Sequence, residues 1–157
     1  MDEIAVRLDY EKVAAGVYGA ISRLDGATTK LANEAGIEPA LRELIRIRAS
    51  QLNGCAYCVD MHTKDARKGG ESEQRVYAVP VWRETPFFSE RERAALAFTE
   101  VVTLMADTHV PSAAWEAAAT VFDEQEMAAV LSLILTINAW NTIGVATRSW
   151  LPGSYEA

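Results

Sequence analysis

The apolar residues of this chain recur at the three- to four-residue spacing that is typical of amphipathic helices. A first helix is expected over residues 10–23, with Asp9 as its N-cap. Its apolar face contains Val13, Val17 and Ile21, and we expect a looser stretch after it. No segment alternates apolar and polar residues over the length of a strand. The pattern therefore predicts an all-α fold.

Start and stop signals divide the rest of the chain into further helices. Pro39 suits the first turn of a helix that ends at the Asn-Gly dipeptide 53–54. The next helix should begin near Cys55 and end at the Gly-Gly pair 69–70. Further helices are expected from 89 to about 106, from 111, and from 123, the first and last behind capping boxes. Together these elements predict a single-domain helical bundle over residues 1–157.

The last helix contains no charged residue from 127 to 147, and that length could span a bilayer. Polar residues such as Ser132, Asn138 and Asn141 interrupt it, and no basic cluster flanks it. A helix that is apolar on several sides also suits a core covered by both its own subunit and a partner. We therefore expect no membrane association, and a homo-oligomer instead.

The charge of the chain narrows the classes of partner. Asp and Glu number 22 against 15 Lys and Arg, which gives a formal net charge of −7. This balance disfavours nucleic acid and anionic membranes as partners. The chain also shows no signal peptide, so we expect a cytoplasmic, reducing environment. Basic residues nevertheless gather around the cysteine segment, where most are expected to form a solvated helix face: Arg42, Arg46, Arg48, Arg67 and Lys68.

The residue types with the most reactive side chains lie between residues 43 and 62. Cys55 and Cys58, the two cysteines of the chain, are separated by two residues, and His62 follows one helical turn later. On a helix these three fall within a sector of roughly 60°. A thiolate is favoured at a helix N-terminus and beside an imidazole that can take its proton. Glu43 precedes the pair on the adjacent helix, where burial could raise its pKa for proton transfer.

Other interpretations of these residues remain open. A structural zinc site usually needs four ligands at paired spacings, but the other histidine, His109, lies alone and is expected at a helix end. A purely structural disulfide over so short a loop would remove little chain entropy. Two inert buried thiols are a further alternative. Glu43 could also be a surface carboxylate paired with Arg46.

The segment LRELIRIRASQLNGCAYCVDMHTKDARKGGE resembles the core of the alkylhydroperoxidase D-like proteins, within the carboxymuconolactone decarboxylase family. The resemblance implies that Cys58 attacks the peroxide and that Cys55 resolves the sulfenic acid into a disulfide. It implies a proton relay through His62 and Glu43. The best-studied branch has a histidine where this chain has Tyr57, and a phenol is a poorer base at neutral pH, which argues against high turnover.

The resemblance also implies partners and alternatives. A hydroperoxide substrate and a dithiol reductant are expected, with no metal or flavin, in a trimer or hexamer. The family name suggests a lactone decarboxylase, although decarboxylating members generally lack the cysteine pair. A non-catalytic redox-sensing module is a third hypothesis. Residues of two other family-like segments are expected to be structural: Trp82, Arg83, Glu84, Asn138, Trp140 and Asn141.

Overall fold

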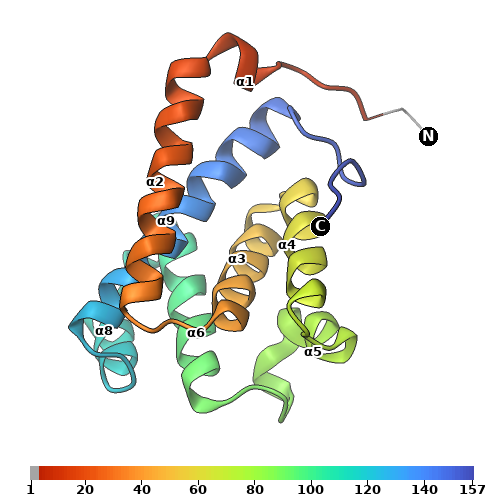
Figure 1. The fold of residues 1–157 in the computed structure, drawn as a ribbon. Coiled ribbons are helices and arrows are strands. Elements are labelled where there is room, and N and C mark those ends of the chain that lie inside the picture. The colour runs from red at the N-terminus through yellow and green to blue at the C-terminus, as the bar shows by residue number, and fades with distance from the viewer. Residues whose placement is uncertain (1–3) are drawn as a thin grey trace.

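The computed structural model describes residues 4–157, and within that range it contains helices and no strand, which confirms the all-α prediction (Figure 1). The α-helices are α1 (Tyr10–Val13), α2 (Ala15–Glu34), α3 (Pro39–Asn53), α4 (Ala56–Lys68), α5 (Glu73–Ala78), α6 (Glu90–Thr103), α7 (Met105–Thr108), α8 (Ser112–Ala119) and α9 (Glu124–Thr147). A 3₁₀ helix, η1 (Val79–Glu84), follows α5.

Most of the predicted helix ends lie where the sequence signals place them. Asp9 accepts a hydrogen bond from the backbone N–H of Lys12, and α3 begins at Pro39. Complete capping boxes open α6 and α9, at Ser89 with Glu92 and at Asp123 with Glu126. These contacts satisfy backbone N–H groups that a helix start would otherwise leave unpaired.

The first helix differs from the prediction. It breaks at Ala14, and its continuation, α2, runs on to Glu34 through the stretch expected to be loose. Burial explains the extension, because Thr28 and Ala32 lie against α9. The hydroxyl groups of Thr28 and Thr136 are hydrogen-bonded at 2.9 Å. Tertiary packing thus outweighs the weak helix propensity of this glycine- and threonine-containing segment.

Helix α3 lies at the centre of the fold and packs against α4, α6 and α9. One apolar cluster fills the space between α3, α6, α8, α9 and the end of α2, and a second joins α3 to α4, α5, η1 and α6. A third and smaller cluster contains both cysteines, Ala49 and Ile137. The core therefore fixes α3 and α4 side by side and brings the cysteines against α9.

Helix α9 is the one described helix that is long and apolar enough to cross a membrane by length and composition. Half of its most apolar window is buried inside the chain, against α2, α3 and α6. Its outer side exposes Leu131, Leu135 and Val145. A core helix of a bundle passes the same length and composition test.

Candidate active site

The turn between α3 and α4 positions the two cysteines. Gly54 ends α3 in the left-handed conformation, with φ of 70°, which is easily adopted by a residue without a Cβ. Cys55 follows as the N-cap of α4, and Cys58 lies in its first turn. The two sulfur atoms form a disulfide. The backbone N–H of Cys58 donates to Cys55 Sγ at 3.4 Å, a contact that also favours a Cys55 thiolate.

A buried amide network holds this turn against α9. Asn53 donates to the side-chain oxygens of Asn138 at 2.7 Å and Asn141 at 3.0 Å. Asn141 donates in turn to the hydroxyl of Ser50 at 3.0 Å. No buried side-chain polar atom among the described residues is left unpaired, which is compatible with the structural role expected for Asn138 and Asn141.

His62 and Glu43 form the predicted contact across α4 and α3. His62 Nδ1 lies 2.8 Å from Glu43 Oε2, and the His62 side chain is buried. Arg46 donates to the other oxygen of Glu43 at 2.7 Å. On α4, His62 is one turn beyond Cys58, so the two side chains share a face. The carboxylate therefore orients an imidazole next to a reactive sulfur.

The pKa of Glu43 differs from the expectation. Burial raises it, but the hydrogen bond and charge of His62, together with those of Arg46, more than offset burial, so the pKa lies below its ordinary value. The expectation of a raised pKa is wrong because it considered burial without these two partners. Glu43 is thus a carboxylate at neutral pH and suits a role in orienting His62.

This lowered pKa predicts a pH dependence of stability. A carboxyl group with a lower pKa in the folded state contributes stability above its unfolded pKa, about 4.3, and loses it as the pH falls through the folded value. We expect the free energy of unfolding of the wild type to fall more steeply below about pH 4.3 than that of Glu43→Gln. Denaturant titrations from pH 3 to 7 measure this, with Glu116→Gln, at an exposed position of α8, as control. Equal slopes for wild type and Glu43→Gln would contradict it.

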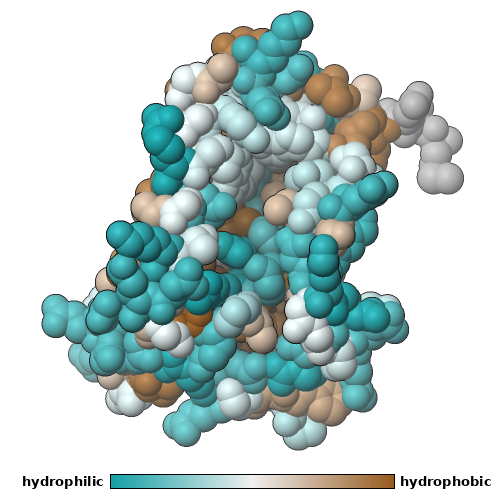
Figure 2. All heavy atoms as spheres, in the orientation of Figure 1, coloured by the Kyte–Doolittle hydropathy of each residue, from teal (hydrophilic) through white to brown (hydrophobic). Residues whose placement is uncertain are grey.

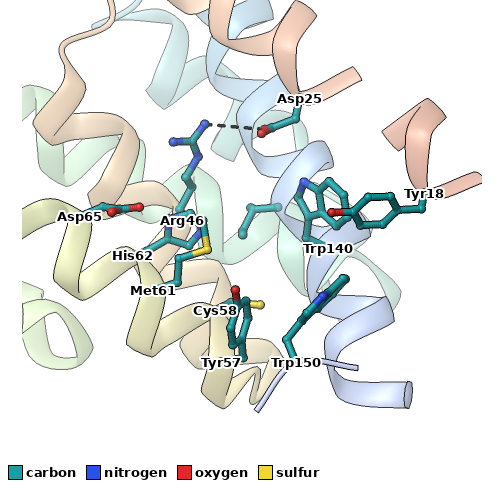
Figure 3. Close-up of a pocket in the computed structure, with 11 residues that line it drawn as sticks. Tyr18, Asp25, Arg46, Tyr57, Cys58, Met61, His62, Asp65, Trp140 and Trp150 are labelled. Carbon is teal, nitrogen blue, oxygen red and sulfur yellow. Dashed lines mark ion pairs between the residues drawn. The ribbon is translucent and has the colours of Figure 1, made fainter. Parts of the chain in front are cut away.

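A pocket of about 250 Å³ opens over Cys58 and His62. It is the hollow between α2 and α4 in Figure 2. Cys58 lines the pocket but is only 4% exposed. Aromatic side chains form much of the wall around it: Tyr18, Tyr57, Trp140 and Trp150 (Figure 3). Their rings pack in edge and tilted contacts with centroids 5.5–6.2 Å apart. The wall beside Cys58 is therefore largely aromatic, whereas Asp25, Arg46 and Asp65 add charged groups to the rest of the lining.

Several pocket residues were not predicted from the sequence. Tyr18 and Asp25 come from α2, and Trp150 follows α9, so all three are far from the cysteines in the chain. Trp140 was expected to be structural, yet it lines the pocket. Trp82 is structural as expected, since its indole N–H donates to Glu100 at 2.9 Å.

Of the five basic residues expected to form a solvated face, Arg67 and Lys68 are exposed, whereas the three arginines of α3 are largely covered. Arg42 is buried and donates to the carbonyl of Ile37 at 2.7 Å. Arg46 contacts Glu43 and, at 3.8 Å, Asp25, as the dashed line in Figure 3 shows. Arg48 donates to Glu100 at 2.7 Å. Arg46 and Arg48 therefore pair with carboxylates on their own helix or on neighbouring helices, and Arg42 is bound to a backbone carbonyl.

Two tyrosines near the site are poor bases. Burial raises the pKa of Tyr57, so its phenol stays protonated at neutral pH. Tyr155 donates to Asp65 at 2.8 Å, and this hydrogen bond raises the pKa of Tyr155 to about 12. Glu43, His62 and Asp65 offer ligand atoms within 4.8 Å of one another, but Glu43 and Asp65 are already held by Arg46 and Tyr155.

Gly144 on α9 allows the close approach of the disulfide. A Cβ at this position would lie 2.9 Å from Cys55 Sγ. We expect Gly144→Ala to destabilise the oxidised protein by about 1–3 kcal/mol, the usual cost of overpacking. Gly26→Ala on α2 is the matched control, because its Cβ would meet nothing within 4 Å and should be neutral or stabilising. Denaturant midpoints of the oxidised proteins test this, and equal midpoints for Gly144→Ala and wild type would contradict it.

Fold and site together define an all-helical protein with a Cys-x-x-Cys disulfide at a helix N-terminus beside a His–Glu pair. The chain belongs to the carboxymuconolactone decarboxylase family, whose model matches residues 15–101 and so includes all four of these residues. It is an alkylhydroperoxidase D-like member of that family.

Known relatives agree with this placement. YdfG, an uncharacterized protein of Bacillus subtilis, is 44% identical over 117 residues, which are 74% of this chain and 80% of YdfG. A crystal structure from Agrobacterium tumefaciens, of a protein of unknown function suggested to be the antioxidant defence protein AhpD, is 38% identical. It has a TM-score of 0.87 and covers 94% of this chain and 99% of its own. The debrominase Bmp8 shares the fold at 22% identity, with a TM-score of 0.69 over 86% of this chain and 74% of its own.

Proposed function

We propose that this protein is a thiol-dependent peroxidase with an antioxidant role, in which Cys58 and Cys55 alternate between two thiols and a disulfide. The observation that carries the proposal is the Cys55–Cys58 disulfide, whose Cys58 side opens into a pocket shared with His62, itself hydrogen-bonded to Glu43. An inert thiol pair needs neither the pocket nor the buried base.

The oxidative half-reaction follows from these positions. His62 takes the proton of the Cys58 thiol, and the thiolate attacks one oxygen of the hydroperoxide. The O–O bond breaks, the alkoxide leaves and receives the proton from His62, and Cys58 becomes a sulfenic acid. The Cys55 thiol gives up its proton, and the thiolate, which the N–H of Cys58 favours, attacks the Cys58 sulfur. The displaced hydroxide takes up that proton and leaves as water. The disulfide seen in the structure is the product.

The lining of the pocket supports an organic hydroperoxide as substrate. Four aromatic rings form much of its wall, and planar or aliphatic groups gain free energy by leaving water for such a surface. Hydrogen peroxide offers no apolar surface to that wall. We therefore expect kcat/KM for cumene hydroperoxide to exceed that for hydrogen peroxide by about tenfold or more.

Peroxide consumption with a low-molecular-weight dithiol as reductant tests the proposal. The wild type should consume cumene hydroperoxide catalytically, with one dithiol oxidised for each alcohol formed. Trp140→Ala should raise KM for cumene hydroperoxide more than for hydrogen peroxide. A redox-sensing module would form the disulfide without turnover, so consumption that stops after one equivalent would support that alternative.

The same site suggests a second candidate reaction. A debrominase with this fold is known in complex with 2,3,4-tribromopyrrole, and the aromatic side chains of the pocket in this chain would also suit a halogenated ring. Two thiols could replace a C–Br bond by C–H, releasing bromide and a proton while the disulfide forms. Bromide release from a brominated pyrrole by the reduced protein, compared with peroxide consumption, decides between the two reactions.

We also propose that the protein is a homo-oligomer, either a trimer or a hexamer. Apolar side chains are exposed on the two long helices and on the short helix before them: Val17 on α2, Leu131 and Leu135 on α9, and Val13 at the end of α1. Leu135 is 54% and Val13 69% exposed, so one subunit leaves them in water. Light scattering should show a defined assembly at micromolar concentration. A monodisperse monomer would contradict this.

A further inference from the structure

The pocket over Cys58 has two chemically different sides. Figure 3 shows Asp25 and Arg46 on the side of His62 that faces away from Cys58, whereas Trp150 lies on the same side as Cys58. The four aromatic side chains of the lining are all partly exposed, so part of each ring surface faces the cavity. A ligand in this pocket therefore meets aromatic ring faces and charged groups together.

The charged groups of this pocket are negative on balance. Asp25 and Asp65 each contribute a carboxylate, and Arg46 is the one permanent cation among the described lining residues. Arg46 is already engaged, since it pairs with Glu43 at 2.7 Å and with Asp25 at 3.8 Å. Asp65 accepts the phenol O–H of Tyr155, which carries no charge to offset the carboxylate. The lining thus favours positive charge in a ligand over negative charge.

The same carboxylates act on the aromatic wall. Burial is the largest cause of the raised pKa of Tyr57, and the charges of Asp60 and Asp65 are among the others that raise it. Lys64 opposes them but is itself paired with Asp60 at 2.9 Å. The effect of the two carboxylates has the sign expected of a place where added negative charge is unfavourable.

We infer that the substrate of this pocket is an organic molecule with a positively charged ammonium group, and that the pocket selects against anions. An ammonium group is attracted to the faces of aromatic rings, most strongly to tryptophan. Trp140 and Trp150 supply such faces, and they share one cavity of about 250 Å³ with two carboxylates. The inference rests on the proposed function in that the ammonium group belongs to the hydroperoxide, but the preference for a cation can be measured without any reaction.

Three ligands of one shape test this preference in the absence of peroxide. Choline has a trimethylammonium group, neohexyl alcohol has carbon in place of that nitrogen, and the anion of tert-butylacetic acid joins the same tert-butyl group to a carboxylate. Titration of the oxidised protein, followed by the fluorescence of the tryptophans in the pocket, measures the three affinities. We expect choline to bind about five- to twentyfold more tightly than the neutral alcohol, and the anion to bind most weakly. Added salt should reduce these differences.

Matched variants separate charge from shape. Asp25→Asn and Asp65→Asn should each weaken choline binding by about two- to fivefold and leave the binding of neohexyl alcohol unchanged. Asparagine at position 65 keeps an oxygen for the phenol of Tyr155. Trp140→Leu keeps an apolar side chain but removes the ring, so it should weaken choline more than the alcohol. Asp107→Asn, at an exposed position of α7 outside the pocket, is the control and should change neither affinity.

A second experiment connects the preference to turnover. Two forms of cumene hydroperoxide, with a trimethylammonium group or a carboxylate at the para position, are given to the wild type with dithiothreitol as an uncharged reductant. We expect kcat/KM to be about tenfold higher for the cation.

The outcomes of the two experiments are distinguishable. Equal affinities for choline and neohexyl alcohol, tighter binding of the anion, or a preference for choline that both asparagine variants retain would overturn the inference. Consumption of both hydroperoxides with equal kcat/KM would also overturn it, while the proposed function would stand. A preference for choline without consumption of either hydroperoxide would contradict the proposed function and leave the cation site standing.

Discussion

Cys58→Ser is expected to lower the rate of hydroperoxide reduction by roughly 10³-fold or more, since it removes the nucleophile. Cys55→Ser should behave differently. It should consume one equivalent of hydroperoxide and then stop in the absence of reductant, with a sulfenic acid at Cys58 that dimedone captures. The reason is positional, because Cys58 lines the pocket with His62 whereas Cys55 does not.

The measurement is peroxide consumption by the reduced variants, with mass spectrometry of the dimedone adduct. The contrary outcome has its own physical basis. Cys55 is the N-cap of α4 and accepts the N–H of Cys58, which favours its thiolate. If Cys55→Ser abolishes the reaction with hydroperoxide while Cys58→Ser retains the first turnover, the helix N-terminus and not His62 selects the nucleophile.

His62→Ala should slow the reaction with hydroperoxide by about 10²- to 10⁴-fold near neutral pH, the usual effect of losing a general base. Because the defect lies in deprotonation, raising the pH toward about 8.5, the ordinary pKa of a thiol, should recover part of the rate. Glu43→Gln should show the same pattern more weakly, since it keeps a hydrogen-bonding oxygen for His62 but removes the charge.

The pH dependence of thiol alkylation and of peroxide reduction measures this effect, on protein shown to be folded and assembled. His109→Ala is the matched control, because that histidine ends α7 at an exposed position far from the cysteines in the chain. Profiles of His62→Ala that match those of the wild type would make the histidine a structural residue.

The sequence predicts the local parts of this molecule well. Capping boxes, the proline at the start of α3 and the Gly54 stop each depend on residues within one turn, and each lies where it was expected. The Cys-x-x-Cys pair and His62 share a helix face for the same reason. Such features follow from helix geometry alone.

What the sequence does not predict depends on contacts between distant segments. The extension of α2 follows from burial of Thr28 and Ala32 against α9, and the aromatic wall combines Tyr18 with Trp150 from opposite ends of the chain. The lowered pKa of Glu43 likewise requires the approach of His62 and Arg46 to one carboxylate. The apolar periodicity within one helix gives no information about these contacts between distant segments.

The central claim is that Cys55 and Cys58 form one redox pair, and the most direct test counts thiols and peroxide together. Reduced protein is mixed with one equivalent of cumene hydroperoxide, and thiols, alcohol and disulfides are measured by titration, chromatography and peptide mapping. The account predicts two thiols lost for each alcohol formed, with one intramolecular Cys55–Cys58 disulfide. Thiols that survive, or disulfides found only between chains, would contradict it.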